Sequence, residues 1–400
     1  MPAVADGFRI GVNYWPSETA MEWLPRYDGG VWRRDLQRIA GAGMDTVRIF
    51  LRWDDLQPSR TAGTLDSAAL ANIVDIADAA GDAGAELIVT LFTGHMSGVN
   101  WIPAWATGGD YGDQRFRVVS GRTVHPGRRV LRNWYGDVDV RDAQARLAHG
   151  VATVLAGHPA VWAWDLGNEN SNCTTPRDRA AADAWMDRMS SVLRACDPRV
   201  LITLGTHMED LECDRVLGPA EAARWCDFVC MHGYPIYAGW SAGPTDERLV
   251  PFLADVTRWL AAGTPVLFSE FGHPTALSPP PDAVSPLAVT EDEAATYAAR
   301  TLDALREVGA IGALAWCYAD YQPSLFDRPP LDLAVHERTF GLWRADGTPK
   351  PSVAEFVKRR DLPCVPASAA QPWLDVTPSE FAADRRGNLV RLFERYCRSG

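Results

Sequence analysis

Long apolar runs are missing from this sequence. No stretch reaches the roughly 18 consecutive apolar residues that a membrane-spanning helix needs. Residues 1–7 also lack the basic start and the apolar centre of a secretory signal peptide, and strand-like sequence begins at Phe8. We therefore expect a protein that has no membrane partner and that works in the cytoplasm.

A surplus of basic residues is missing as well. The chain has 39 Lys and Arg against 51 Asp and Glu, which gives a formal net charge of −12 at pH 7. Binding to nucleic acid depends on basic side chains that neutralise phosphates. The charge therefore argues against a nucleic-acid partner, whereas it is compatible with a neutral ligand such as a sugar.

The eight cysteines lack the spacing of a disulfide scaffold or of a zinc site. They are scattered over a chain of 400 residues, and the two closest, Cys226 and Cys230, have no second pair at zinc-binding spacing. We therefore expect free thiols, and we predict neither a metal site nor a cofactor.

The sequence is rich in material for a large core. Hydrophobic residues make up 47% of it, and sixteen residues are tryptophan. Apolar, strand-like segments alternate with segments whose apolar residues recur at helical spacing. The strand-like segments are residues 8–15, 46–51, 86–93, 161–170, 200–206, 227–235, 265–272 and 311–318, and the clearest helical ones are residues 30–42, 66–83, 176–196, 246–261 and 290–309.

This order of segments predicts an α/β fold, a (β/α)8 TIM barrel with enlarged loops, over residues 1–360. A doubly wound open sheet is the alternative, but the glycine-rich phosphate loop that it would need does not follow the first strand-like segment. Residues 361–400 are a C-terminal extension. We predict one helix in it, which begins at the capping box from Thr377 to Glu380 and packs on the barrel.

Carboxylates stand at the ends of two predicted strands, Glu169 on the fourth and Glu270 on the seventh. A barrel of this kind has its active site at the carboxyl ends of its strands, so side chains at those ends should meet at one mouth. The other candidates at or near the strand ends are Arg48, His95, Asn168, His232, Tyr234 and Trp316.

Two opposed glutamates suit the hydrolysis of an acetal. One protonated carboxyl group donates to the departing glycosidic oxygen while the other attacks the anomeric carbon as a carboxylate. Arg48 and Tyr234 could hold the attacking carboxylate ionised, because a cation and a hydrogen-bond donor both favour the charged form. Water then releases the sugar with its configuration retained, which requires carboxyl groups about 5–5.5 Å apart.

A known family has a similar ordered set of residues on the corresponding strands. In this chain the set is Arg48, Asn168-Glu169, His232-Gly-Tyr234, Glu270 and Trp316. It resembles that of the clan A glycoside hydrolases, above all glycoside hydrolase family 5, which includes cellulases, β-mannanases and related β-glycosidases. The resemblance covers about residues 8–356. It implies an acid/base role for Glu169, a nucleophile in Glu270, binding of the sugar 2-hydroxyl by Asn168, and a platform beneath the sugar in Trp316.

Aromatic residues on the loops near the mouth are further candidates. Their faces could cover the apolar side of a pyranose, or they could pack within the loops; they are Trp15, Trp101, Trp105 and Trp240. His95 either binds substrate or holds the long loop of residues 94–139. That loop decides between exo and endo action, because it could close one end of the cleft.

The predicted function is a retaining β-glycoside hydrolase that acts on β-linked oligosaccharides. The resemblance to bacterial intracellular members of the family, together with the missing export signal, favours a β-mannosidase or a β-mannanase-like enzyme. A β-glucosidase or endoglucanase-like hydrolase of the same clan is the alternative. Two other classes stay open: a catalytically silent carbohydrate-binding barrel, and a metal-dependent barrel enzyme with His95, His232 and the glutamates as ligands.

Overall fold

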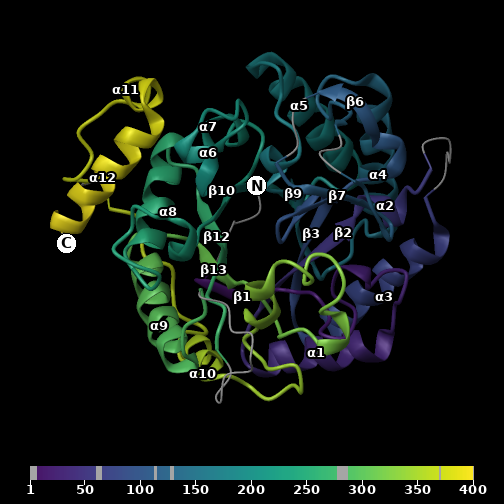
Figure 1. Cartoon of the computed structure of the whole chain (residues 1–400), viewed down its shortest axis with the longest axis horizontal. Coiled ribbons are helices and arrows are strands. Elements are labelled where there is room, and N and C mark those ends of the chain that lie inside the picture. Colours follow the sequence, from purple (N-terminus) through teal and green to yellow (C-terminus); the bar gives the residue numbers. More distant parts are fainter. Residues whose placement is uncertain are drawn as a thin grey trace.

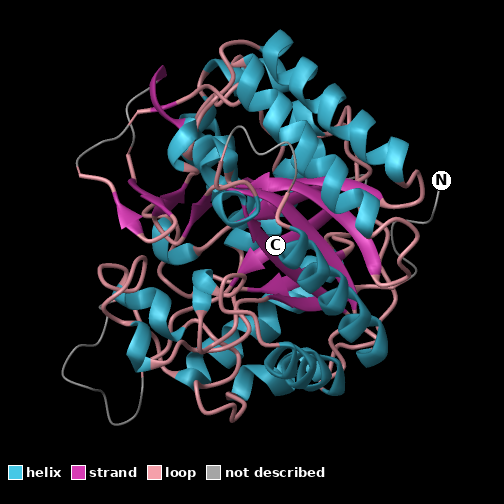
Figure 2. Cartoon of the chain, turned by 90° about the vertical axis from the view of Figure 1, so that its right-hand side faces the viewer, coloured by secondary structure: helices cyan, strands magenta, loops and turns pink. Residues whose placement is uncertain are grey.

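The central element of the protein is a closed barrel of parallel strands. The structure, a computed structural model, describes residues 7–59, 65–111, 115–126, 130–276, 287–368 and 371–399. The strands follow one another around the barrel in the order β1-β13-β12-β11-β10-β9-β3-β2 (Figures 1 and 2). They are β1 (Arg9–Asn13), β2 (Thr46–Arg52), β3 (Glu86–Thr93), β9 (Val161–Asn168), β10 (Leu201–His207), β11 (Val229–His232), β12 (Val266–Phe271) and β13 (Gly312–Ala315). The predicted (β/α)8 barrel is confirmed.

Helices surround the barrel and connect its strands (Figure 2). The long ones are α1 (Gly29–Gly41), α3 (Ser67–Ala83), α4 (Val138–Val154), α5 (Arg179–Cys196), α8 (Leu249–Leu260), α9 (Glu291–Glu307) and α10 (Pro351–Val357), and the short ones are α2 (Trp53–Leu56), α6 (Met208–Glu212) and α7 (Pro219–Ala222). Side-chain caps explain where α3 and α9 begin: Asp66 accepts hydrogen bonds from the first turn of α3, and Thr290 forms a capping box at α9.

The start of α5 differs from the prediction. The sequence places Pro176 at the first helical position, whereas the helix begins at Arg179. Asp178 is the N-cap, and its side chain accepts a hydrogen bond from the N–H of Ala181. The physical reason is that an aspartate cap satisfies an N–H at the helix start, which proline cannot do.

The barrel strands are buried on both faces. Every residue of β2, β9 and β10 is buried. One compact cluster takes residues from six of the barrel strands and from the segment before β11, and Trp162 in it stacks on Phe228 with ring centroids 4.9 Å apart. This core fills the barrel interior, and it leaves the carboxyl ends of the strands for polar side chains.

The loop after β3 has structure that the sequence does not predict. It contains β4 (His95–Met96), β5 (Val99–Trp101), β6 (Thr107–Tyr111), β7 (Arg117–Ser120) and β8 (Thr123–Val124). Four of these strands form a separate small sheet in the order β4-β5-β7-β8. Strands of two to four residues are too short to show an alternating pattern, which is why sequence periodicity misses them.

The C-terminal extension has two helices where the sequence predicts one. The capping box at Thr377 is present and starts α11 (Pro378–Ala383), but Asp384 leaves the helical conformation with φ −148° and ψ 77°. The second helix, α12 (Arg385–Ser399), contacts α6 and α8 and lies beside α8 in Figure 1. Its buried residues are Leu389, Leu392 and Phe393.

Two further features concern the cysteines and the character of the helices. All eight cysteines are within the described residues and are free thiols, as predicted. Among the helices that the structure describes, none combines the length and the apolar character that crossing a bilayer requires.

Candidate active site

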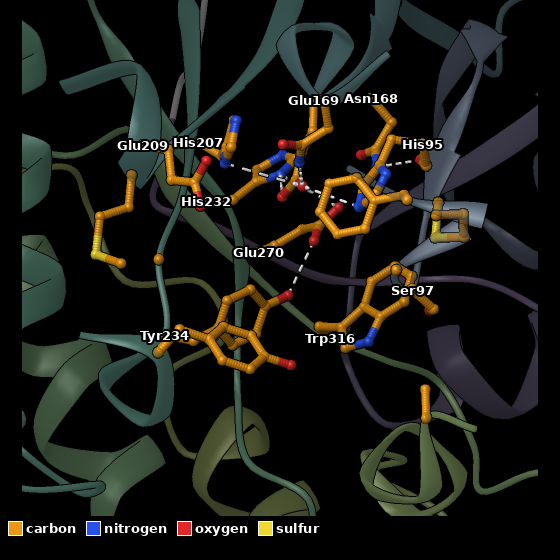
Figure 3. Close-up of a pocket in the computed structure, with 18 of the residues that line it drawn as sticks. His95, Ser97, Asn168, Glu169, His207, Glu209, His232, Tyr234, Glu270 and Trp316 are labelled. Carbon is orange, nitrogen blue, oxygen red and sulfur yellow. Dashed lines mark hydrogen bonds and ion pairs between the residues drawn. The ribbon is translucent and has the colours of Figure 1, made fainter. Parts of the chain in front are cut away.

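A cavity of about 530 Å³ opens at the carboxyl ends of the barrel strands. Figure 3 shows its polar side chains pointing toward one another from several strands. Most of the site residues predicted from the sequence line it: His95, Asn168, Glu169, His232, Tyr234, Glu270 and Trp316. The barrel therefore brings to one place side chains that are up to 221 residues apart in the sequence, from His95 to Trp316.

Arg48 lies directly behind the cavity and is fully buried. Its Nη1 donates to Glu270 Oε1 over 2.6 Å, and its Nη2 donates to Asp165 Oδ2 over 2.7 Å and to Asn168 Oδ1 over 2.8 Å. Burial lowers the pKa of Arg48, but the two carboxylates outweigh it and keep the guanidinium charged. Arg48 therefore orients Glu270 and Asn168 and does not itself line the cavity.

Glu270 comes from the end of β12 and accepts a second hydrogen bond from the hydroxyl of Tyr234 over 2.9 Å. Burial raises the pKa of Glu270 above its usual value, while His232, Arg48 and Tyr234 act in the opposite direction. The carboxylate thus accepts from a charged donor, Arg48, and from a neutral donor, Tyr234, which lines the cavity. This geometry holds both oxygens of a buried carboxylate in place, because each accepts from a different donor.

Glu169 follows β9 in a left-handed backbone conformation, with φ 49°. Residues other than glycine rarely adopt it, and such residues cluster at functional sites. Its Oε1 is 3.0 Å from His232 Nδ1, and its Oε2 accepts from Asn172 Nδ2 over 3.0 Å. Burial raises the pKa of Glu169, but the charges of His207, His232 and His95 lower it further than burial raises it.

The two glutamates face each other across His232. Oxygens of Glu169 and Glu270 and a ring nitrogen of His232 all lie within 4.8 Å of one another. His232 Nδ1 is 3.0 Å from Glu169 and 3.5 Å from Glu270. Two carboxyl groups at this distance titrate as a pair, because the charge of one opposes the ionisation of the other.

The same three side chains offer ligand atoms that could hold a metal ion. Their oxygens already accept hydrogen bonds from protein donors, and the buried cation of Arg48 is 2.6 Å from Glu270. A fixed cation in contact with the carboxylate raises the cost of adding a second cation. The donor set therefore fits a metal poorly.

His207 and Glu337 line the cavity but are not among the predicted site residues. His207 ends β10, and its Nδ1 is 4.0 Å from Glu169 Oε2. Burial lowers the pKa of His207, but Asp210, Glu169 and Glu209 raise it more. The sequence carried the signal for His207, since it ends a strand like the others, but the predicted strand stopped at Thr206.

Glu337 reaches the cavity from the loop after β13. Its Oε2 accepts from the indole Nε1 of Trp316 over 3.1 Å and from the hydroxyl of Ser97 over 3.0 Å. Ser97 has a left-handed backbone with φ 52°. Burial raises the pKa of Glu337. The strand-end rule cannot find this residue, because a loop folds back to deliver it.

The loop tryptophans are not equivalent. Trp15 is fully buried and stacks on Phe50, with centroids 5.0 Å apart. Trp101 is 2% exposed and lies under the guanidinium of Arg52. Neither lines the cavity, so the structure does not give either ring a face for a sugar. Trp240, in contrast, is a lining residue.

His95 is placed both to meet a substrate and to hold the loop after β3, the two roles considered from the sequence. It lines the cavity, with Nε2 3.9 Å from Glu169 Oε2, and its Nδ1 is 2.8 Å from Asn100 Oδ1 within the loop. Burial lowers the pKa of His95, which favours the neutral imidazole.

Comparison with known proteins links this geometry to one family. The family model described as cellulase (glycosyl hydrolase family 5) matches residues 5–322. No curated protein sequence gives a significant match. A GH5_18 protein from Streptomyces cattleya, solved in complex with GlcNAc, superimposes with a TM-score of 0.78 at 24% identity over 98% of this chain and 90% of that one. A variant of it has been solved with Manβ1-4GlcNAc.

Two more solved structures have the same fold. A GH5_18 protein from Bifidobacterium longum subsp. infantis gives a TM-score of 0.72 at 23% identity, over 90% of this chain and 80% of that one. An exo-β-1,4-mannosidase from Opitutaceae bacterium strain TAV5 gives a TM-score of 0.70 at 28% identity, over 89% of this chain and 59% of that one.

Proposed function

The chain belongs to glycoside hydrolase family 5. We propose that it is a retaining exo-β-mannosidase that releases single sugars from short β-linked oligosaccharides. The observation that carries the proposal is the carboxyl pair of Glu169 and Glu270, with oxygens within 4.8 Å of each other. That spacing suits retention, since inversion needs carboxyl groups about 6.5–9.5 Å apart.

In the first step Glu270 is the nucleophile and Glu169 is the acid. Arg48 and Tyr234 hold Glu270 in place, and its carboxylate attacks the anomeric carbon while Glu169 donates its proton to the glycosidic oxygen. A bound sugar displaces water from Glu169, which favours the protonated form that this step needs. The charges of the histidines around Glu169 act against this protonation.

In the second step Glu169 takes a proton from water, and the water attacks the glycosyl-enzyme. Two inversions at one carbon retain the configuration. Asn168 supports both steps. Its Oδ1 accepts from Arg48, and one N–H of its side-chain amide donates to the carbonyl of His95. The second N–H of the amide can donate to the 2-hydroxyl of the sugar.

Two loops that contact each other close the cavity on the Trp316 side, and this supports exo action. Ser97 donates to Glu337, and Arg117 forms a bidentate pair with Asp332 at 2.7 Å for both bonds. Each contact joins the loop after β3 to the loop after β13. Since Trp316 would lie beneath the sugar at the cleavage point, a wall beside it limits this side of the cavity to one terminal sugar.

The choice of mannose draws on the comparisons. The Opitutaceae protein is an exo-β-1,4-mannosidase, and the Streptomyces cattleya variant holds a β-mannoside. The test is a panel of 4-nitrophenyl β-mannoside, glucoside, galactoside and xyloside. We expect kcat/KM for the mannoside to exceed the others by at least about tenfold, which corresponds to 1.4 kcal/mol of transition-state binding. A glucoside that is hydrolysed as fast would favour the β-glucosidase alternative, and binding without turnover would favour a silent barrel.

A further inference from the structure

The C-terminal extension reaches the cavity, and we propose that its helix α12 builds the binding place of the departing sugar by holding Trp240 as an aromatic platform. This inference rests on the proposed function, because it assumes a glycosidic bond between the two glutamates. It assigns to the extension a part in choosing the substrate. The proposal is carried by the lining of the cavity, by two contacts of Trp240, and by the position of Arg386.

The acid identifies the side on which the departing sugar lies. Glu169 would protonate the glycosidic oxygen, so the leaving group must lie beyond Glu169 as seen from Trp316. The cavity lining on that side begins with His207, 4.0 Å from Glu169, and continues along α6 to Glu212. Figure 3 shows His207 and Glu209 on the far side of Glu169 from Trp316.

Trp240 lies one step further along this lining. Its Nε1 donates to Glu212 Oε1 over 2.8 Å. From His207 to Glu212 the chain advances five residues, which is about 7.5 Å at 1.5 Å per helical residue. A pyranose that leaves from Glu169 therefore comes to lie between His207 and Trp240.

Helix α12 fixes Trp240 from behind. The ring of Phe393, which is 3% exposed, meets the indole edge-on with centroids 5.2 Å apart and an interplanar angle of 75°. Phe393 is itself packed against Phe252 of α8. With its N–H bonded to Glu212 and Phe393 packed against it, the indole has one orientation, and it lines the cavity. A fixed aromatic face binds the apolar face of a sugar with little loss of side-chain entropy.

The helix also supplies a polar group at the same place. Arg386, near the start of α12, lines the cavity, with Nη1 3.9 Å from Glu212 Oε2. Its guanidinium and the Glu212 carboxylate together offer donors and acceptors to sugar hydroxyls. The aromatic platform of Trp240 and the polar pair of Arg386 and Glu212 thus both depend on α12.

The test compares two substrates that differ only in the leaving group. β-1,4-Mannobiose places a sugar against Trp240, whereas β-mannosyl fluoride places nothing there. We expect Trp240→Ala to lower kcat/KM for mannobiose by about tenfold or more, from the lost stacking and buried area, and to leave kcat/KM for the fluoride within about twofold. Arg386→Ala changes an exposed side chain, and it should lower the mannobiose value by a smaller factor and spare the fluoride.

Phe393→Ala tests the role of the helix, and Arg391→Ala is its matched control. Arg391 is on the same helix and pairs with Asp375, so its loss should change neither substrate. Phe393→Ala should act on mannobiose alone; if it unfolds the helix, the Trp240 and Arg386 variants still decide. Equal losses on both substrates, or an unchanged mannobiose value in Trp240→Ala, would overturn the inference. A wild type that hydrolyses neither substrate would overturn the proposed function with it.

Discussion

Asp165 is the residue through which the buried charge of the site can be tested most sharply. It lies within β9 with no exposed surface, 2.7 Å from Arg48. Its Oδ2 accepts from Arg48 and Thr90, and its Oδ1 accepts from the N–H of Gly205. Asparagine would keep the shape but lose the charge, and it would turn an NH2 group toward one of these donors.

The expected cost of Asp165→Asn follows from these contacts. Removing one partner of a buried ion pair costs about 3–5 kcal/mol. Arg48 keeps Glu270 as a second counter-charge at 2.6 Å, so we expect the lower end, about 3 kcal/mol. That is a large part of the roughly 5–15 kcal/mol by which a folded domain is stable.

The assay is urea unfolding followed by tryptophan fluorescence and circular dichroism. Asp142→Asn is the matched control, because Asp142 pairs with Arg188 at 2.6 Å but the two side chains are 45% and 37% exposed. An exposed pair contributes about 0–1 kcal/mol. If the two variants lose the same small amount of unfolding free energy, the view that Asp165 neutralises a buried Arg48 is wrong.

Three further predictions concern catalysis. Glu169→Ala should lower kcat/KM for mannobiose by about 10²–10⁴-fold but act far less on a dinitrophenyl mannoside, whose leaving group needs no proton; equal losses would contradict the acid role. His207→Gln removes a charge that lowers the pKa of Glu169, so the pKa of Glu169 should rise. The alkaline limb of the pH profile of kcat/KM should then move to higher pH, and a shift to lower pH would contradict this. Glu337→Gln should lower kcat/KM for 4-nitrophenyl β-mannoside by about tenfold or more, with little change in thermal stability, because the Glu337 carboxylate lines the cavity and accepts from the indole of Trp316. An unchanged value would contradict a role for Glu337 in placing Trp316.

The barrel could be predicted from the sequence because its strands are buried on both faces. Such strands are continuous apolar runs, and the predicted segment at residues 86–93 coincides with β3. The small sheet after β3 could not be predicted, since β4 and β8 have two residues each. The single predicted tail helix became two because Asp384 breaks the helical backbone, which the apolar spacing does not reveal.

In the site, too, residues at strand ends could be predicted, whereas residues inside a strand or on a loop could not. Glu169 and Glu270 could be proposed because the barrel gathers strand ends at one mouth. Asp165 was missed because it lies inside β9, and Glu337 because its loop folds back over the mouth. Whether Trp15 presents a face to the cavity depends on its stacking with Phe50, which local sequence does not encode.

The most direct test of the account is to identify the residue that becomes glycosylated. The enzyme is incubated with 2-deoxy-2-fluoro-β-mannosyl fluoride, which slows release of the sugar, and the digested protein is examined by mass spectrometry. We predict one fluorosugar on the peptide that contains Glu270, and no label in Glu270→Ala. A label on another residue, or turnover of β-mannosides with inverted configuration and no covalent adduct, would contradict the two-glutamate mechanism.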